Sequence, residues 1–249
     1  MIRKGPRPHP ARHWRMGFAL AAGGLLLTGL AAVFGSAEQT GRATNAPQAY
    51  DADLLVAIPY PAGYELRQVH FLLVVGNPAD VEAEIRQVKD NFLASIPGSL
   101  ELDEDGVGAA FAATGFVWPT GQGTWFYVDN DVHRPAGLVN HRQSIAAGAS
   151  TWGSAGADFA FVDGGSTAQD NPPCTGYNAV GWAQLDVYGP TVLGVACTGY
   201  SGPTPVFDLN FDTDGSWSTD DSPSSGEIDL QSVSVHEFGH VAGLGHTQP

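Results

Sequence analysis

Apolar residues in the first half of the chain follow two different periods, and each period predicts a different element. Residues 54–58 and 69–75 are short apolar runs of strand length. Asn77-Pro78 breaks the second run, and apolar residues then recur every three to four positions, at Val81, Ile85, Val88 and Phe92. Charged residues stand between them, so the pattern predicts an amphipathic helix that ends before Pro97. The acidic residues 100–107 predict a turn.

The second half alternates predicted strands with predicted helices. Residues 125–128 predict a strand, residues 135–154 a helix, and residues 158–162 a second strand closed by Asp163-Gly164-Gly165. Three further strands are expected, at 178–187, 191–196 and 205–211. A last helix follows Asp229, whose carboxylate suits an N-cap, and we expect it to bury Val235, Phe238 and Ala242 against the sheet. The order of elements predicts an α+β fold.

The amino terminus predicts export from the cytoplasm. Residues 17–34 are apolar without a charged side chain, basic residues precede them, and the small residues Gly35-Ser36-Ala37 follow. This order predicts a signal peptide over 1–37, with an uncleaved membrane anchor as the alternative. Both interpretations put the rest of the chain outside the cytoplasm, so we expect a secreted protein. Residues 38–52 are polar and predict a linker.

The acidic composition of the chain excludes some classes of partner. The formal net charge is -15, and five of the 11 basic residues lie in the leader, so the remaining 6 basic and 26 acidic residues carry -20. Such a surface repels nucleic acid and anionic lipid, and we expect neither as a partner.

Cys174 and Cys197 are the only cysteines, which predicts one disulfide in an exported chain, with two buried thiols as the alternative.

The carboxyl end carries a metal-binding motif. Residues 236–246 have the spacing H-E-x-x-H-x-x-G-x-x-H. His236 and His240 are one helical turn apart, so both imidazoles leave the same helix face. Gly243 suits the end of the helix, after which the chain brings His246 to a third ligand position. Three protein ligands leave a fourth position open on zinc, which is typical of a catalytic site, and Glu237 is the candidate general base.

This segment, with residues 229–233 before it, resembles the active-site helix of the metzincin zinc peptidases, most closely the matrixin branch and its bacterial secreted relatives. The resemblance implies a twisted, mostly parallel sheet with a long helix and a carboxyl-terminal active-site helix, preceded by a small N-terminal α/β region. It implies one catalytic zinc held by His236, His240 and His246, with Glu237 as the base. Metzincins have a methionine turn after the third histidine. This chain ends at Pro249, so we expect a fragment or a site without that floor.

The resemblance also suggests domain boundaries. Residues 120–249 correspond to a catalytic domain truncated after the third histidine, and residues 53–119 to a pro-region or an accessory domain. The pro-region of matrixins usually blocks the zinc with a cysteine. Residues 53–119 contain none, so any inhibition must work by other means.

Residue types bear on two further metal sites, a structural zinc that the resemblance suggests and a calcium site that the acidic residues suggest. Vertebrate matrixins hold a structural zinc with histidines, but the matching position is Asn210, a poor zinc ligand, so we expect no structural zinc. Asp212 and Asp214 offer oxygen ligands for calcium, although a polar turn is the favoured interpretation. His70, His133 and His141 lack ligand spacing, and we expect them to be ordinary surface or hydrogen-bonded residues.

The sequence therefore predicts a secreted zinc endopeptidase that acts on proteins or peptides. Zinc activates water, and Glu237 takes its proton as the water attacks the peptide carbonyl. The substrate is expected to lie extended along a strand edge. The alternatives are a non-catalytic secreted zinc-binding interaction module and a hydrolase for another bond. The oligomeric state and the cleavage preference do not follow from the sequence.

Overall fold

The computed structural model describes residues 47–60, 63–102, 118, 121–128, 134–155, 159–168, 174–220 and 222–245. The predicted signal peptide, His133 and His246 lie outside these residues, as does the predicted linker up to residue 46. Among the residues that are described, no helix has both the length and the apolar character needed to cross a membrane.

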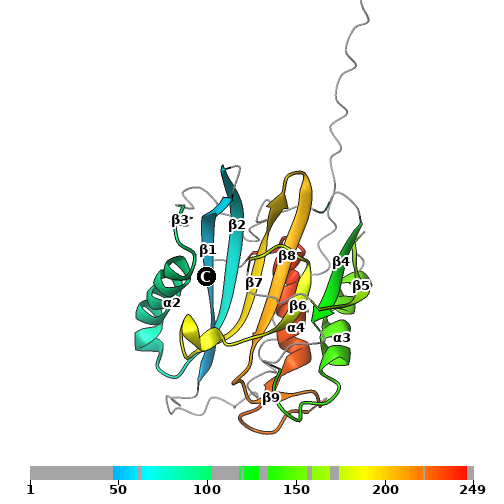
Figure 1. Ribbon diagram of the computed structural model, residues 1–249. Coiled ribbons are helices and arrows are strands. Elements are labelled where there is room, and N and C mark those ends of the chain that lie inside the picture. Colours follow the sequence, from blue (N-terminus) through cyan, green and yellow to red (C-terminus); the bar gives the residue numbers. More distant parts are fainter. Residues whose placement is uncertain are drawn as a thin grey trace, which may run out of the picture.

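One sheet of eight strands organises the fold (Figure 1). Its spatial order is β3-β1-β2-β7-β8-β6-β4-β5. Figure 1 shows the N-terminal β1–β2 hairpin, in blue and cyan, beside the yellow β7, although the two are far apart in the sequence. The bounds of the strands are β1 Gln48–Tyr60, β2 Gly63–Val75, β3 Leu100–Glu101, β4 Gln122–Val128, β5 Ala160–Thr167, β6 Ala179–Ala183, β7 Val192–Ser201 and β8 Thr204–Asp212.

The sheet is mixed, and the expectation of a mostly parallel sheet holds only for its second half. β5, β4, β6 and β8 pair in parallel, whereas β7 pairs antiparallel with β8. β2 then pairs antiparallel with β7, and β1 pairs antiparallel with β2 and β3. The expected N-terminal α/β region thus continues the same sheet, because a hairpin of alternating residues can extend any strand edge. A separate two-stranded parallel ladder joins β9 (Trp217–Ser218) to β10 (Ile228–Asp229).

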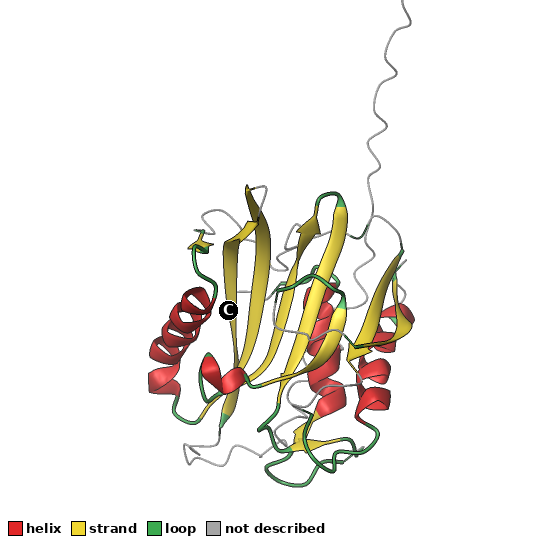
Figure 2. Cartoon of the chain, viewed as in Figure 1, coloured by secondary structure: helices red, strands yellow, loops and turns green. Residues whose placement is uncertain are grey.

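Helices cover both faces of the sheet (Figure 2). On one face α2 (Val81–Ser95) buries Val88 and Phe92 against Val69, Phe71 and the start of β7. On the other face lie α3 (His141–Ser154) and α4 (Leu230–Val241). Two short 3-10 helices, η1 (Pro78–Asp80) and η2 (Leu185–Val187), complete the described helical elements. Each face of the sheet thus has its own apolar core.

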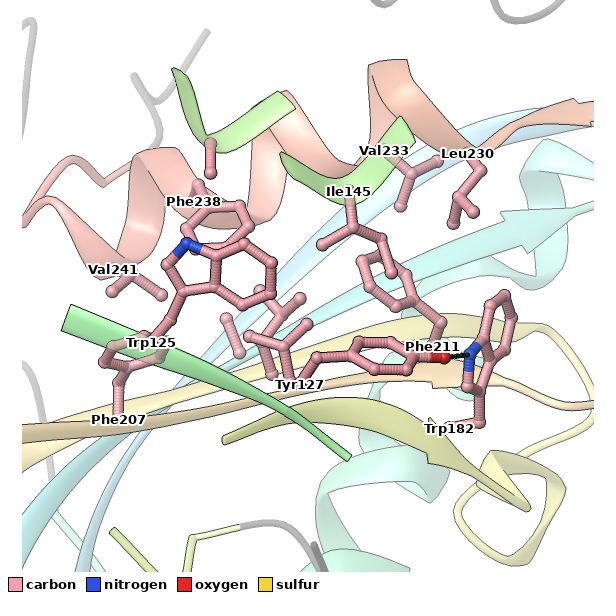
Figure 3. Packing of buried hydrophobic residues seen from close by; sticks show 14 of the residues in the cluster. Trp125, Tyr127, Ile145, Trp182, Phe207, Phe211, Leu230, Val233, Phe238 and Val241 are labelled. Atoms are coloured by element: carbon pink, nitrogen blue, oxygen red, sulfur yellow. Dashed lines mark hydrogen bonds between the residues drawn. The ribbon is translucent and has the colours of Figure 1, made fainter. Parts of the chain in front are cut away.

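Aromatic side chains fill the core beneath α3 and α4 (Figure 3). Phe238 of α4 lies edge-on to Trp125 of β4, with ring centroids 5.9 Å apart. The polar end of Trp182 is satisfied there, because its Nε1 donates a hydrogen bond of 3.2 Å to the Tyr127 hydroxyl. Phe238 confirms its predicted burial, whereas Val235 and Ala242 are only half-buried. The residues of α4 that enter this core are Leu230, Val233, Phe238 and Val241.

Most predicted elements are present, with shifted boundaries. The strands at 54–58, 69–75, 125–128 and 205–211 and the helix before Pro97 are confirmed. β1 begins at Gln48, inside the predicted linker, and α3 begins at His141 rather than near 135. The later start follows a turn in which Gly137 and Asn140 have positive φ values of 80° and 54°. β5 continues through residues 163–165, where a register shift accommodates the glycines.

The disulfide predicted between Cys174 and Cys197 is present, with the two Cα atoms 5.2 Å apart. It joins the segment before β6 to the middle of β7, across 23 positions of sequence. A loop of this length corresponds to about 3 kcal/mol in the chain-entropy model.

α3 and α4 approach each other closely at Gly148, and this contact gives a stability prediction. A Cβ at position 148 would lie 2.5 Å from the Cβ of Ser234 and 2.9 Å from the Val235 nitrogen. Gly148→Ala must therefore separate the helices, and we expect it to lower the free energy of unfolding by about 1–3 kcal/mol. Urea denaturation measures the change. The matched control is Gly76→Ala, where a Cβ meets nothing within 4 Å. A Gly148→Ala protein as stable as this control would contradict the close packing.

Candidate metal centre

α4 presents two histidines of the motif on one side. The Asp229 carboxylate accepts a hydrogen bond of 3.0 Å from the Gln231 nitrogen, which confirms the predicted N-cap. His236 and His240 are one helical turn apart, and their Nε2 atoms lie 3.2 Å from each other. His240 is buried and His236 is half-buried, so both rings lie at the boundary between the helix and the sheet.

α4 ends just before Gly243, where the sequence predicted the end of the helix. Gly243 has a φ of 95°, a conformation that costs glycine little. Its nitrogen donates to the His240 carbonyl at 2.9 Å, and the Leu244 nitrogen donates to the Gly239 carbonyl at 3.0 Å. The chain turns there, as the motif requires. His246 lies outside the described residues, so its role as a ligand stays a prediction.

A third histidine reaches this centre from β2. His70 was expected to be an ordinary surface or hydrogen-bonded residue. It is hydrogen-bonded, but its side chain is buried against α4 beside two histidines of the motif, which the expectation missed. Alternate residues of a strand point to opposite faces. Val69, Phe71 and Leu73 face α2, so His70 faces α4. Its Nε2 lies 3.3 Å from that of His236, and its ring stacks on His240 with centroids 3.5 Å apart.

Asp51 of β1 adds a carboxylate to the three imidazoles. Its Oδ1 lies 3.2 Å from the His236 Nε2 and 3.4 Å from the His70 Nε2. The same alternation places it, since Ala52 and Leu54 belong to the α2 core. β1 and β2 pair so that Asp53 is directly opposite His70 and Asp51 is one step along the same face. Asp51, Asp53, His70, His236 and His240 together are called the metal centre below.

Hydrogen bonds at Nδ1 orient two of the imidazoles. The Asp53 carboxylate lies 3.1 Å from the His70 Nδ1, and the Leu244 carbonyl lies 2.8 Å from the His240 Nδ1. A proton on Nδ1 satisfies each acceptor and makes Nε2 the metal-binding nitrogen, an arrangement common around zinc-binding histidines. Both Nε2 atoms lie close to that of His236, at 3.3 Å for His70 and 3.2 Å for His240.

The carboxylates and imidazoles shift each other's protonation. Burial by itself would lower the pKa of His70, but the hydrogen bonds to Asp51 and Asp53 raise it to about 10. Burial would raise the pKa of Asp51, but hydrogen bonds to His236 and His70 hold it below its usual range. Two carboxylates thus favour positive charge at the centre, supplied by a proton on His70 or by a bound cation.

The spacing of these atoms fits zinc. Zinc binds imidazole nitrogen at about 2.0–2.1 Å in a tetrahedron, which separates neighbouring ligand atoms by about 3.3 Å. The four separations given above among Asp51, His70, His236 and His240 span 3.2–3.4 Å. One ligand atom from each of the three histidines lies within 4.8 Å of the others. Nitrogen and oxygen donors of this kind suit zinc.

Glu237 lies beside the metal centre, in contact with β7. Its side chain is fully buried. A Cβ added at Gly194 would lie 2.8 Å from the Glu237 Oε1, so only glycine leaves room for the carboxylate there. Burial lowers the pKa of His70, and the negative charge of Glu237 acts against this effect, after the larger contributions of the hydrogen bonds to Asp51 and Asp53. Its predicted role as a base is untested.

The other candidate residues lie away from the metal centre. The Asp212 carboxylate accepts hydrogen bonds from the Leu185 and Asp214 nitrogens, at 3.1 and 3.0 Å. Asp212 and Asp214 line a pocket of about 330 Å³, but nothing in the structure supports calcium there. Asn210 is buried within β8. The His141 Nδ1 lies 2.9 Å from the Leu138 carbonyl, so His141 is a hydrogen-bonded residue as predicted.

A signal for His70 and Asp51 was present in the sequence. Both are polar positions within strands whose alternate residues are apolar, and both fall on the face opposite that apolar set. Alternation identifies a shared face within one hairpin. It does not identify which helix will cover that face, so spacing rules for metal ligands missed both residues.

Comparison with known proteins agrees with the carboxyl-terminal motif. Residues 190–249 match the family model described as Matrixin. This stretch contains β7, β8 and α4, and it makes the carboxyl-terminal part of the chain a relative of the matrixins, which are metallopeptidases. No curated protein and no solved structure matches the chain. The hairpin that supplies Asp51 and His70 lies outside the matched residues.

The geometry of the metal centre predicts that zinc stabilises the folded protein. Zinc at a hundredfold excess over its dissociation constant should raise the free energy of unfolding by about 2.7 kcal/mol, because it binds only the folded chain. Calorimetry of the metal-free protein with and without zinc measures this change. His240→Ala should abolish it, whereas the control His141→Ala should keep it. Equal stabilisation of both variants would place the bound zinc elsewhere.

Proposed function

We propose that the protein is a secreted zinc-dependent endopeptidase. The observation that carries this proposal is the convergence of His236 and His240 beside the buried Glu237, within a segment related to the matrixins. A purely structural zinc site has no need of a buried carboxylate next to its ligands. The predicted signal peptide and the disulfide are compatible with an extracellular location.

The proposed roles follow from the chemistry of each side chain. His236, His240 and His246 would hold the ion, and zinc would supply a Lewis acid for the activation of water and the polarisation of a carbonyl. Glu237 accepts the proton from the attacking water and delivers it to the leaving amine. The burial of Glu237 strengthens its interaction with charge that develops nearby.

The substrate would bind as an extended strand. β7 runs over α4, and its two edges pair with β2 and β8, so a peptide could add to β7 only in place of one of these strands. Main-chain pairing would hold a peptide while side-chain pockets select it. Protein or peptide substrates are the class that such an edge recognises.

A non-catalytic zinc-binding module is the alternative function. The observation that favours it is the Asp51 carboxylate, whose Oδ1 lies 3.2 Å from the His236 Nε2 and 3.4 Å from the His70 Nε2 and adds a protein ligand to be tested beside the three imidazoles. A zinc with four protein ligands is typical of structural sites. The two functions differ in what Glu237 does, which the following experiment tests.

Glu237→Ala should lower peptide hydrolysis about 10²–10⁴-fold and leave zinc stoichiometry unchanged, because the base is lost and the ligands stay. Hydrolysis of casein and of fluorescent peptides by the full chain measures the rate, and metal analysis measures zinc. The matched control is Glu82→Ala, an exposed glutamate on α2. A rate equal to that of the control would remove Glu237 as the base.

A second prediction concerns the space beside Glu237. Gly194→Ala puts a methyl group 2.8 Å from the present position of the Oε1 atom, so the carboxylate must move. We expect a loss of at least tenfold in kcat, of the order seen for a displaced catalytic group, with zinc affinity within about twofold of wild type. The conservative variant Glu237→Asp, which is shorter, should restore part of the rate in the Gly194→Ala background. A kcat unaffected by Gly194→Ala would show that this contact does not position the base.

A further inference from the structure

Two tryptophan side chains bind the backbone of α4 on either side of the metal-binding turn. The Trp152 Nε1 donates a hydrogen bond of 2.9 Å to the Val235 carbonyl. The Trp118 Nε1 donates one of 2.8 Å to the Val241 carbonyl. Val235 directly precedes the first histidine of the motif, and Val241 directly follows the second. The two indoles therefore hold the backbone at both ends of the turn that presents the histidines.

The bond from Trp118 completes the end of α4. A helix leaves its last four carbonyls without partners from its own turns. In α4, the three carbonyls before Val241 accept from the nitrogens of residues 242–244, which follow the helix directly. Val241 is fully buried, and its carbonyl accepts from the indole of a residue 123 positions earlier in the sequence. Loss of the indole N–H would take this donor from a buried acceptor.

Trp152, which belongs to α3, lies against the same turn of α4. A Cβ at Gly239 would lie 2.7 Å from the Trp152 Cζ2, so the indole can take this position only because residue 239 is glycine. Gly239 stands between the two histidines of the motif. A larger residue there would push the indole away from the Val235 carbonyl.

We propose that Trp118 and Trp152 are positioning residues for the zinc ligands. Their N–H groups set the rotation of α4 that brings the His236 and His240 Nε2 atoms to 3.2 Å from each other. The inference deepens the proposed function, since it rests on these two histidines as ligands. The tryptophans themselves act through the helix backbone and not by contact with metal or substrate.

Trp118 lies outside the predicted catalytic domain. The sequence assigned residues 53–119 to a pro-region or an accessory domain, and the match to the matrixin model covers residues 190–249. Trp118 nevertheless packs beside Phe159 and Phe207, with ring centroids 5.8 and 6.0 Å away, and bonds to α4. The unit that positions the zinc ligands therefore begins before residue 120.

Phenylalanine separates the two properties of each tryptophan, because it keeps an aromatic ring and has no N–H donor. Trp217 provides the matched control. Its Nε1 also donates to a backbone carbonyl, that of Asp212 at 2.7 Å, and its ring belongs to the same aromatic core. A general loss of stability would affect Trp217→Phe as much as the other two variants, whereas a positioning role would not.

The first test measures metal binding by the full chain. Cobalt(II) replaces zinc, and its visible absorption reports the geometry of its ligands. Trp118→Phe and Trp152→Phe should each weaken cobalt affinity about tenfold and alter the absorption, because groups that orient metal ligands have effects of this size. Trp217→Phe should bind cobalt as the wild-type chain does. Equal affinities and spectra for the three variants would overturn the proposal.

Gly239→Ala moves the indole and leaves both tryptophans in the chain. Alanine favours a helix more than glycine does, so a weaker helix cannot explain a loss of metal binding in this variant. We expect cobalt affinity and absorption to change in the same direction as in Trp152→Phe. A Gly239→Ala chain that binds cobalt as wild type would contradict the role of Trp152.

Hydrogen exchange of the metal-free chain tests the same inference without a metal. Each phenylalanine variant at 118 or 152 should speed amide exchange in residues 236–244 about tenfold relative to Trp217→Phe, because local opening of the helix then breaks one bond fewer. Mass spectrometry of peptic fragments measures the exchange. Rates equal to those of Trp217→Phe would overturn the proposal.

The two proposals fail in different ways. If the variants at Trp118 and Trp152 weaken cobalt binding as expected but Glu237→Ala hydrolyses peptides as fast as its control, the positioning role stands and the endopeptidase fails. If hydrolysis depends on Glu237 but all three tryptophan variants bind cobalt equally, the endopeptidase stands and the positioning role fails.

Discussion

The pairing of β2 with β7 determines the chemistry of this protein. Because alternate residues of a strand face opposite ways, one register puts Val69, Phe71 and Leu73 into the α2 core and His70 against α4. A shift of one residue would bury His70 among apolar side chains and turn Phe71 toward the histidines. The apolar core on one face therefore fixes the polar centre on the other.

Contacts with α3 fix the position of α4. Gly148 of α3 lets the helices approach, and the Trp152 Nε1 donates to the Val235 carbonyl at 2.9 Å. Phe238 anchors the inner side among the aromatic rings of the sheet. The histidines between these contacts have little freedom, which is what a metal site with closely spaced ligand atoms requires.

The residues that match the matrixin model and the hairpin that lies outside them contribute different groups to the metal centre. The matched residues 190–249 contain the strand and helix from which peptidase chemistry is proposed. The hairpin lies outside them and brings His70 and Asp51 to the histidines of α4. The disulfide and the mixed sheet join both parts into one framework.

The sequence by itself determined the local structure of the site. The i, i+4 spacing placed His236 and His240 on one helix face, Asp229 predicted the start of α4, and Gly243 predicted its end, because capping, helical periodicity and glycine conformation act within a few residues. Strands such as β2 and β8 were equally visible in their alternation. Only the tertiary structure decided that a hairpin near the amino terminus joins β7 and brings Asp51 and His70 to that helix. Strand pairing depends on which edges meet in space, and no spacing along the chain records that choice.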